Sequence, residues 1–191
     1  GGDGRDHIIG GDGFDTLDGG AGSDLIEAGE DRSEIFGGAG SDTIFSGEND
    51  SFVDAGTGSD FVQAGVFSDD IVFGGDGNDI IFVEGDDDIV SGDAGKDKIF
   101  GGADEDTIFG GQDNDSIEGG DDNDLLSGDE GNDRLFGGEG DDLIMGVTGN
   151  DTLTGGGGSD TFVFGNGDGT DFIVDFEKGV DKIGLVTGEL V

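Results

Sequence analysis

The sequence predicts an all-β fold: a parallel β-roll, meaning a right-handed two-sheet β-helix built from nine-residue units, with a C-terminal β cap. Three observations support this prediction. A nine-residue period runs through residues 1–163 in 18 units, one of which, 64–73, carries an extra residue. Position 8 of the unit is apolar in all 18 units, and position 6 is Asp in 16 of them. A short fixed period is typical of solenoids, in which each unit packs only on its neighbours.

Each unit is expected to contribute one short strand. Positions 7 to 9 are rich in Ile, Val, Leu, Phe and Thr, which favour β structure. Neighbouring side chains of a strand point to opposite faces, so position 8 points inward and positions 7 and 9 point outward. A three-residue strand buries only one side chain, so successive strands must alternate between two stacked sheets. Two units then form one coil, and the 18 units give a roll about 40 Å long at ~4.8 Å per strand spacing.

The rest of each unit is a turn rich in glycine, which accounts for 46 of the 191 residues. Glycine at positions 1, 2 and 4 is expected to supply backbone conformations with positive φ. Asp and Asn tolerate the left-handed region better than most residues. This tolerance accounts for the residues that replace glycine at position 4, namely Asp31, Asn49, Asp104, Asp113 and Asp122.

Residues 164–191 leave the nine-residue period and are dense in apolar side chains, among them Phe172, Phe176 and Leu185. Terminal units of repeat folds have to cover an open end. We therefore expect a roll over residues 1–163 and a capping segment over 164–191. The chain opens in mid-pattern at Gly1, from which we expect further sequence upstream.

Composition argues against several classes of protein. The chain has 48 acidic and seven basic residues and a formal charge of −41. Nucleic-acid binding is therefore not expected, because phosphate contacts need a basic surface. There is no Cys and one His, His7, which excludes disulfides and multi-histidine sites within this chain, and His7 is expected to face solvent. No apolar run approaches the roughly 20 residues that span a bilayer.

The same composition suggests that cations sit between the turns. One aliphatic side chain per strand is a thin core, and self-repulsion of the net negative charge opposes compaction.

No paired base and nucleophile stands out from the repeat, so we do not expect this chain to be an enzyme by itself.

At the repeats the chain resembles a known family. Units such as GGAGSDTIF (37–45) and GGDGNDIIF (74–82) match the pattern GGxGxDxUx, in which U is apolar. They resemble the RTX, or hemolysin-type, calcium-binding nonapeptide repeats. The tail, 161–185, resembles the segment that follows such repeats in secreted RTX proteases.

The resemblance implies Ca²⁺ ions between the turns of units n and n+2, held by Asp carboxylates and turn carbonyls. It also implies a secreted bacterial protein, extracellular or at the cell surface. Such chains leave the cell unfolded through the type I secretion machinery, and the secretion-signal region could begin within 164–191.

Ligand chemistry supports calcium independently. Ca²⁺ prefers six to eight oxygen ligands in flexible geometry, whereas Mg²⁺ needs a rigid octahedron and keeps its waters. Zn²⁺ is usually bound by thiolate or imidazole ligands, and this chain has no Cys and one His. The predicted metal ligands are the Asp residues at position 6: Asp6, Asp15, Asp24, Asp42, Asp60, Asp70, Asp79, Asp88, Asp97, Asp106, Asp115, Asp124, Asp133, Asp142, Asp151 and Asp160. Asp168 and Asp171 are candidates for a last ion.

The number of ions follows from the number of turns. Nine turns on each edge leave eight gaps, so the ceiling is sixteen ions. Four units on one edge depart from the pattern: unit 4 has Ser33 and unit 6 has Ser51 at position 6, unit 8 has Phe67 in an inserted turn, and unit 10 begins with Val83. Five gaps touch these turns, so we expect about eleven ions. Two interpretations stay open, tolerated drift or a surface for a partner such as an upstream domain.

Outward Phe residues are a second feature with two interpretations. Stacked Phe side chains could shield the sheet, or they could form an interaction surface, because contiguous apolar patches often mark interfaces. An ice-binding face would need regular ranks of outward Thr, which this sequence does not form. The residues in question are Phe36, Phe45, Phe73, Phe82, Phe100, Phe109 and Phe136.

The sequence therefore leads to one main functional hypothesis. The chain is expected to stay unfolded at low cytosolic calcium and to fold on extracellular Ca²⁺ after export. Expected partners are calcium ions, an upstream domain of the same polypeptide and the type I secretion machinery. The alternatives are an adhesion or surface-binding spacer, and the non-catalytic C-terminal part of a secreted protease, lipase or polysaccharide-modifying enzyme.

Overall fold

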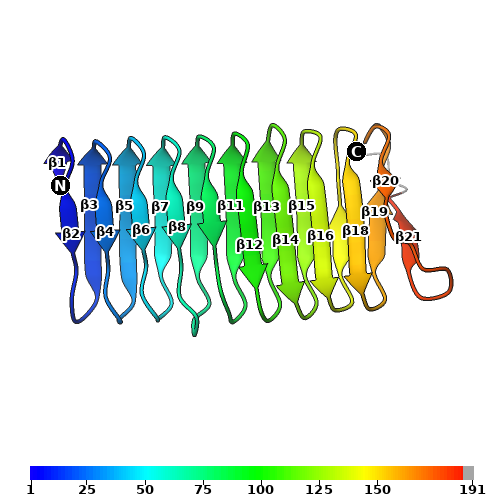
Figure 1. Cartoon of the computed structure of the whole chain (residues 1–191), viewed down its shortest axis with the longest axis horizontal. Coiled ribbons are helices and arrows are strands. Elements are labelled where there is room, and N and C mark those ends of the chain that lie inside the picture. The colour runs from blue at the N-terminus through cyan, green and yellow to red at the C-terminus, as the bar shows by residue number, and fades with distance from the viewer. Residues whose placement is uncertain (187–191) are drawn as a thin grey trace.

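A computed structural model describes residues 1–186 and shows a long, flattened roll of two parallel sheets (Figure 1). One sheet has eleven strands and the other has ten, and the strands alternate between the sheets along the chain. The predicted all-β, two-sheet parallel fold is confirmed. No helix within residues 1–186 is long and apolar enough to cross a membrane.

The strands of the two sheets have the following bounds. The eleven-stranded sheet consists of β1 (Gly2–Asp3), β3 (Asp15–Ala21), β5 (Ser33–Ala39), β7 (Phe52–Thr57), β9 (Ile71–Asp76), β11 (Ile89–Ala94), β13 (Thr107–Gln112), β15 (Leu125–Glu130), β17 (Leu143–Met145), β19 (Thr161–Phe164) and β21 (Lys182–Leu185). The ten-stranded sheet consists of β2 (His7–Ile9), β4 (Leu25–Glu27), β6 (Thr43–Phe45), β8 (Phe61–Gln63), β10 (Ile80–Phe82), β12 (Lys98–Gly102), β14 (Ser116–Asp121), β16 (Arg134–Glu139), β18 (Thr152–Gly157) and β20 (Phe172–Ile173).

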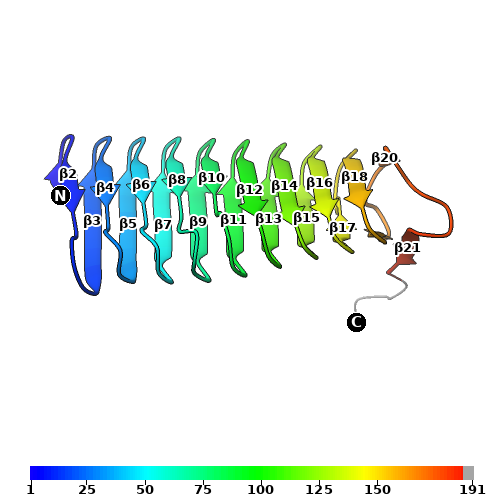
Figure 2. The same cartoon turned by 60° about the horizontal axis from the view of Figure 1, so that its bottom comes forward.

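Strands two units apart pair side by side, so each coil advances the chain by 18 residues (Figure 2). Ile26, for example, is the register partner of Ile44. Across the ten-residue unit the offset grows to 19 residues, as in the pair Val53 and Val72. The extra residue is taken up in the turn between β8 and β9, so position 8 keeps its register along the whole roll.

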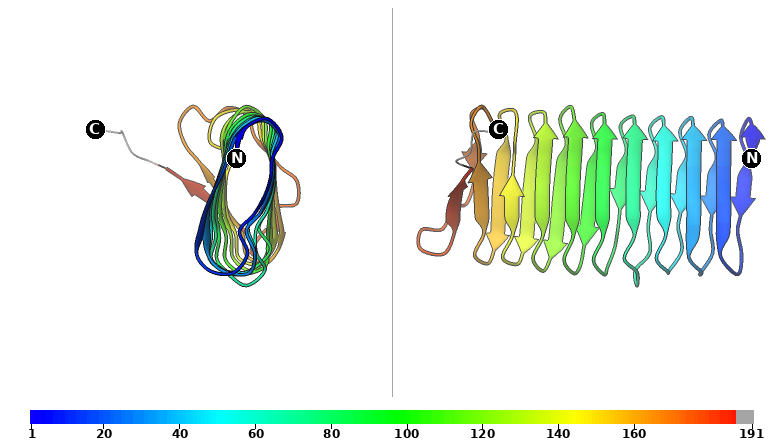
Figure 3. Two further views of the ribbon diagram at one scale, coloured as in Figure 1. Left: turned by 90° about the vertical axis from the view of Figure 1, so that its left-hand side faces the viewer. Right: turned by 180° about the vertical axis from the view of Figure 1, so that it is seen from behind.

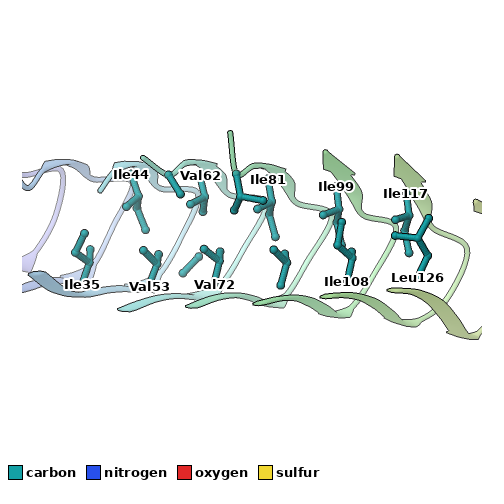
Figure 4. Packing of buried hydrophobic residues seen from close by; sticks show 14 of the residues in the cluster. Ile35, Ile44, Val53, Val62, Val72, Ile81, Ile99, Ile108, Ile117 and Leu126 are labelled. Carbon is teal, nitrogen blue, oxygen red and sulfur yellow. The ribbon is translucent and has the colours of Figure 1, made fainter. Parts of the chain in front are cut away.

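The core lies between the sheets, as two facing rows of aliphatic side chains (Figure 4). Viewed along its axis, the roll is a stack of flattened oval coils with one sheet on each side (Figure 3). The buried position-8 residues are Leu17, Ile26, Ile35, Ile44, Val53, Val62, Val72, Ile81, Val90, Ile99, Ile108, Ile117, Leu126, Leu135, Ile144, Leu153 and Phe162.

Many strands are longer than the predicted three residues. Strand β13, for instance, continues from positions 7 to 9 of one unit through positions 1 to 3 of the next. Because strand side chains alternate, positions 6, 8 and 1 all point inward. The turns are correspondingly short and centre on positions 4 and 5.

Glycine at position 1 serves packing rather than positive φ, so that part of the prediction was wrong. Positive φ occurs at positions 2 and 4, as at Gly38 and Gly40, but not at Gly37. A β-carbon on Gly37 would lie 2.3 Å from the carbonyl oxygen of Ala55 and 2.9 Å from Oδ2 of Asp42. The missing side chain therefore makes room for the inward carboxylate of the same unit.

Position 4 has a positive φ in fifteen of the 18 units. Asp104, Asp113 and Asp122 have φ of 75°, 74° and 73°, as predicted. The prediction was wrong for Asp31 and Asn49, which do not have positive φ. The carbonyl oxygens of both residues accept hydrogen bonds from serine hydroxyls, which hold these turns in another conformation.

Beyond residue 163 the nine-residue spacing ends, but the strand pairing continues. Strand β20 pairs with β18, and β21 pairs with β19. These short strands form a further partial coil at the C-terminal end. Several apolar side chains there remain exposed, including Phe172, Ile183 and Leu185. The last five residues of the segment predicted to cap the roll lie outside the described residues.

Candidate metal centre

The position-6 aspartates form two columns, one along each edge of the roll. Odd-numbered units make the odd edge and even-numbered units make the even edge. Fourteen of the sixteen predicted ligands are buried, each with 3% or less of its surface exposed. Asp6 and Asp15, near the N-terminal end, are only partly buried.

From Asp24 onward on the odd edge and from Asp70 onward on the even edge, one oxygen of each carboxylate accepts a backbone hydrogen bond. On the odd edge the backbone N–H of Asp97 donates to Oδ1 of Asp115 over 2.8 Å, and Asp115 donates likewise to Asp133. The same bond recurs along the odd edge from Asp6 to Asp151, and along the even edge from Ser51 onward. The Oδ1 ladder holds the carboxylates from Asp24 and from Asp70 onward in a repeated orientation.

The other oxygen is left without a partner. Buried polar groups are nearly always hydrogen-bonded, and an orphaned one is costly. Within residues 1–186, thirteen carboxylate oxygens are both buried and unpartnered, and a bound cation would satisfy such oxygens. They are Oδ2 of Asp15, Asp24, Asp42, Asp60, Asp79, Asp88, Asp97, Asp106, Asp115, Asp124, Asp133, Asp142 and Asp151.

Burial also disfavours the charged form of several of these carboxyls. Desolvation raises the pKa of Asp88 and Asp115 to about 8 and that of Asp60 to about 7. The backbone N–H donated to each carboxylate lowers the pKa, and neighbouring carboxylates raise it further. In the absence of a cation, burial therefore shifts the carboxyls of Asp60, Asp88 and Asp115 towards the protonated form near neutral pH.

The donor set fits Ca²⁺ better than other metals. Within residues 1–186 no three acidic, His or Cys side chains cluster tightly enough to hold a metal by themselves. An ion bound to an orphaned Oδ2 would therefore have at most two such side chains and would take its remaining ligands from other oxygens, such as backbone carbonyls and water. All-oxygen coordination that mixes carboxylate and carbonyl groups is what Ca²⁺ prefers.

Units 8 and 10, two of the even-edge units that depart from the repeat pattern, differ from each other in the structure. Asp70, in the inserted unit, has no orphaned oxygen, because its Oδ2 accepts bonds from Gly65 N at 2.9 Å and Ser68 Oγ at 3.3 Å. Unit 10 is regular despite its opening Val83: Asp86 has a positive φ, and Oδ2 of Asp88 is orphaned.

Two residues beyond the repeat extend the columns, and of these Asp171 was a predicted candidate whereas Asp181 was not. The backbone N–H of Asp151 donates to Asp171 Oδ1 over 3.0 Å, and that of Asp160 donates to Asp181 Oδ1 over 3.2 Å. Their signal is an Asp two residues before an apolar residue, outside the nine-residue spacing. Asp171 was a candidate for a last ion, whereas Asp168 instead accepts a bond from Gly165 N in a local turn.

A second ladder, at position 5, was also missed. The backbone N–H of Asn132 donates to Asn114 Oδ1 over 2.7 Å, and that of Asn150 donates to Asn132 Oδ1 over 2.9 Å. The signal in the sequence is the frequent Asn, Ser and Asp at this position. These bonds join the exposed sides of successive turns.

The outward residues lie as expected. His7 is exposed, with Nε2 2.7 Å from Glu27 Oε2. Phe side chains stack along both outer faces, as in the pair Phe82 and Phe100, whose ring centroids are 4.6 Å apart. This stacking supports the interpretation that they shield the sheets.

A two-sheet parallel solenoid with an inward carboxylate in nearly every nonapeptide defines a class of acidic, cation-binding repeat proteins. Comparison with family models narrows the class. The model of the RTX calcium-binding nonapeptide repeat (four copies) matches residues 1–35, 34–62, 65–99, 84–117, 100–135, 109–144 and 136–171. The chain belongs to this family of calcium-binding repeats.

A solved structure has a similar fold. It is described as a hyperactive, Ca²⁺-dependent, β-helical antifreeze protein from an Antarctic bacterium. The two share 21% sequence identity with a TM-score of 0.50, over 94% of this chain and 83% of the other. At this identity the likeness shows the fold alone. Among curated proteins, no significant sequence match was found.

Proposed function

We propose that this chain is a calcium-driven folding module of a secreted bacterial protein, acting after export through type I secretion. The observation that carries the proposal is the set of thirteen buried, unpartnered carboxylate oxygens arranged at a fixed period. A folded chain without cations would have to leave them unsatisfied or protonated. An unfolded chain would have water for all of them.

Calcium would supply the missing free energy. Metal sites made of stacked turns do not exist in the unfolded chain, so binding free energy becomes folding free energy. The position-6 carboxylates and turn carbonyls would hold the ions, about eleven of them against a ceiling of sixteen. Eleven ions would reduce the formal charge from −41 to −19.

The expected calcium affinity means that the chain would fold only after it has left the cytosol. Extracellular calcium modules bind at about 10⁻⁴–10⁻³ M, far above cytosolic concentrations. The chain would pass the secretion machinery unfolded and fold outside, beside an upstream domain of the same polypeptide. Membership of the calcium-binding repeat family supports this proposal.

The β-roll is a structural, non-catalytic module, and we assign no reaction to it. Ice binding does not carry over from the structural neighbour, because Thr does not form ranks on either outer face. Register partners on neighbouring strands are instead as different as Phe52 and Ile71 on one sheet and Ile80 and Lys98 on the other. An adhesive spacer, or the C-terminal part of a secreted enzyme, would use the same folding step.

Small-angle scattering tests the proposal. The metal-free chain is expected to have a radius of gyration near 47 Å, the value for an unfolded chain of this length, falling below about 20 Å in millimolar CaCl₂. A metal-free chain that is already compact, with no change on adding calcium, would refute the folding role.

A further inference from the structure

Three consecutive turns on the even edge differ from the rest in backbone conformation. Position 4 has a positive φ in every nonapeptide unit except units 4, 6 and 8. The exceptions are Asp31, Asn49 and Phe67, and their turns stack on one another. The regular turn, which repeats along the odd edge and returns at Asp86 in unit 10, is therefore replaced over one continuous stretch.

The polar atoms of these turns are satisfied by the protein. Oδ1 of Asp70 accepts from Ser51 N at 2.6 Å, and Oδ2 accepts from Gly65 N and Ser68 Oγ. Ser51 Oγ donates to the carbonyl oxygen of Asn49 over 2.9 Å. This bond uses a carbonyl oxygen of the turn that could otherwise bind an ion. None of the three turns has a free carboxylate oxygen at position 6. One hydroxyl, Ser46 Oγ, has no partner, but it is neutral.

The interior beside these turns is filled as well. Most units have glycine at position 1, where a β-carbon would approach the carboxylate; on Gly119 it would lie 2.2 Å from Asp124 Oδ2. Unit 4 has buried Ala28 and unit 6 has buried Ser46 at this position, each combined with the shorter serine at position 6. Units 7 and 10 combine a buried Ala55 or Val83 at position 1 with a buried aspartate, so it is the serine at position 6 that removes the carboxylate from units 4 and 6.

The same coils are reinforced by aromatic contacts on both outer faces. On one sheet Phe36, Phe52 and Phe73 form a run with centroid distances of 6.0 and 5.8 Å. On the other sheet a run of four rings has spacings of 6.1, 5.8 and 4.6 Å; its members are Phe45, Phe61, Phe82 and Phe100. Aromatic pairs of this kind are worth about 0.5–1.5 kcal/mol each beyond their buried area.

We propose that the even-edge turns of units 4, 6 and 8 take no calcium and form an ion-free clasp, closed by hydrogen bonds of the protein itself. This inference rests on the proposed calcium-binding function, because it says which gaps between turns stay empty of ions when the others fill. The clasp lets one stretch of the roll keep its strand register without ions on that edge, next to regular turns on the odd edge.

The test is an ion count on the folded, calcium-saturated chain. In one variant, A28G/D31G/S33D/S46G/N49G/S51D, units 4 and 6 are given the regular residues. It should bind two more ions than the wild type, one between units 2 and 4 and one between units 4 and 6. The matched control, A28G/D31G/S33N/S46G/N49G/S51N, has the same glycines without the carboxylates and should bind no additional ion. Bound calcium is counted by equilibrium dialysis and elemental analysis.

Single substitutions give a second arm that does not depend on rebuilding a turn. Asp70→Asn should leave the ion count unchanged, whereas Asp88→Asn should lower it by at least one. An equal loss from both variants, or no gain in the rebuilt variant when it is folded by circular dichroism, would overturn the clasp. A wild-type chain that binds no calcium would instead overturn the proposed function.

Discussion

A regular position-6 aspartate such as Asp115 divides its two oxygens between two tasks. Oδ1 accepts a backbone N–H from the unit two before it, and Oδ2 stays free for an ion. Asn could perform the first task but would bring no charge to the second. The side chain must also be short, because glycine at position 1 leaves only a small space beside it.

Substituting one regular carboxylate should weaken calcium-driven folding. Asp115→Asn removes the charge and one oxygen ligand from two neighbouring gaps, so the calcium midpoint of folding should rise several-fold. Asp121→Asn, on the exposed surface, makes the same charge change and should shift the midpoint little. Equal shifts in the two titrations, followed by circular dichroism, would mean that only overall charge matters.

The packing role of glycine at position 1 can be tested in a regular unit. In Gly119→Ala the new β-carbon would lie 2.2 Å from Asp124 Oδ2 and 2.8 Å from the carbonyl oxygen of Gly137. We expect a loss of about 1–3 kcal/mol, typical of overpacking. Gly157→Ala meets only the flexible end of Glu139 and should be nearly neutral. Urea midpoints at saturating calcium compare the two; similar values would contradict the packing argument.

At the scale of the strand, the sequence predicts the inward row but not the strand ends. Position 8 was identified because it is apolar in every unit, and Ile26, Ile44 and Val62 are all fully buried. The Gly-Gly pair that follows is typical of a turn, yet in β13 it lies within the strand. Pairing with neighbours two units away decides this, and that information is not local.

The candidate site shows the same limit. The columns were predictable because Asp recurs every nine residues, as at Asp97 and Asp106. Asp171 and Asp181 join the columns through longer connections that break the period. The hydrogen bonds that the protein donates to Asp70 could not be predicted either, because they depend on where the inserted turn places Ser68.

The aromatic runs should contribute to stability where they contact. Phe82 lies between Phe61 and Phe100, with centroids 5.8 and 4.6 Å away. Phe82→Ala should cost about 2 kcal/mol through lost burial and ring contacts. Phe67, with 71% of its surface exposed, is the control, and its substitution by Ala should cost little. Equal urea midpoints for the two variants in calcium would rule out a stabilising run.

For the whole molecule, the raised carboxyl pKa values predict an unusual pH dependence without metal. The folded-state pKa values of Asp88 and Asp115, about 8, lie above the value near 3.9 in an unfolded chain. The folded state therefore binds more protons, and its stability is greatest below pH 4 and is lost as the pH rises through about 7 to 8.

The metal-free chain should accordingly gain β structure on acidification. With calcium present the direction reverses, because protons compete with the ion, so the calcium midpoint should rise as the pH falls. Circular dichroism between pH 4 and pH 8, with and without calcium, checks both trends. A metal-free chain equally folded at pH 8 and pH 4 would show that the buried carboxylates do not control folding.

The measurement that tests the central claim most directly is far-UV circular dichroism of the metal-free chain during titration with CaCl₂, with MgCl₂ in parallel. We predict a cooperative transition from coil to β structure near millimolar calcium and none with magnesium. A chain that already has its full β signal without metal, and that calcium leaves unchanged, would contradict the account.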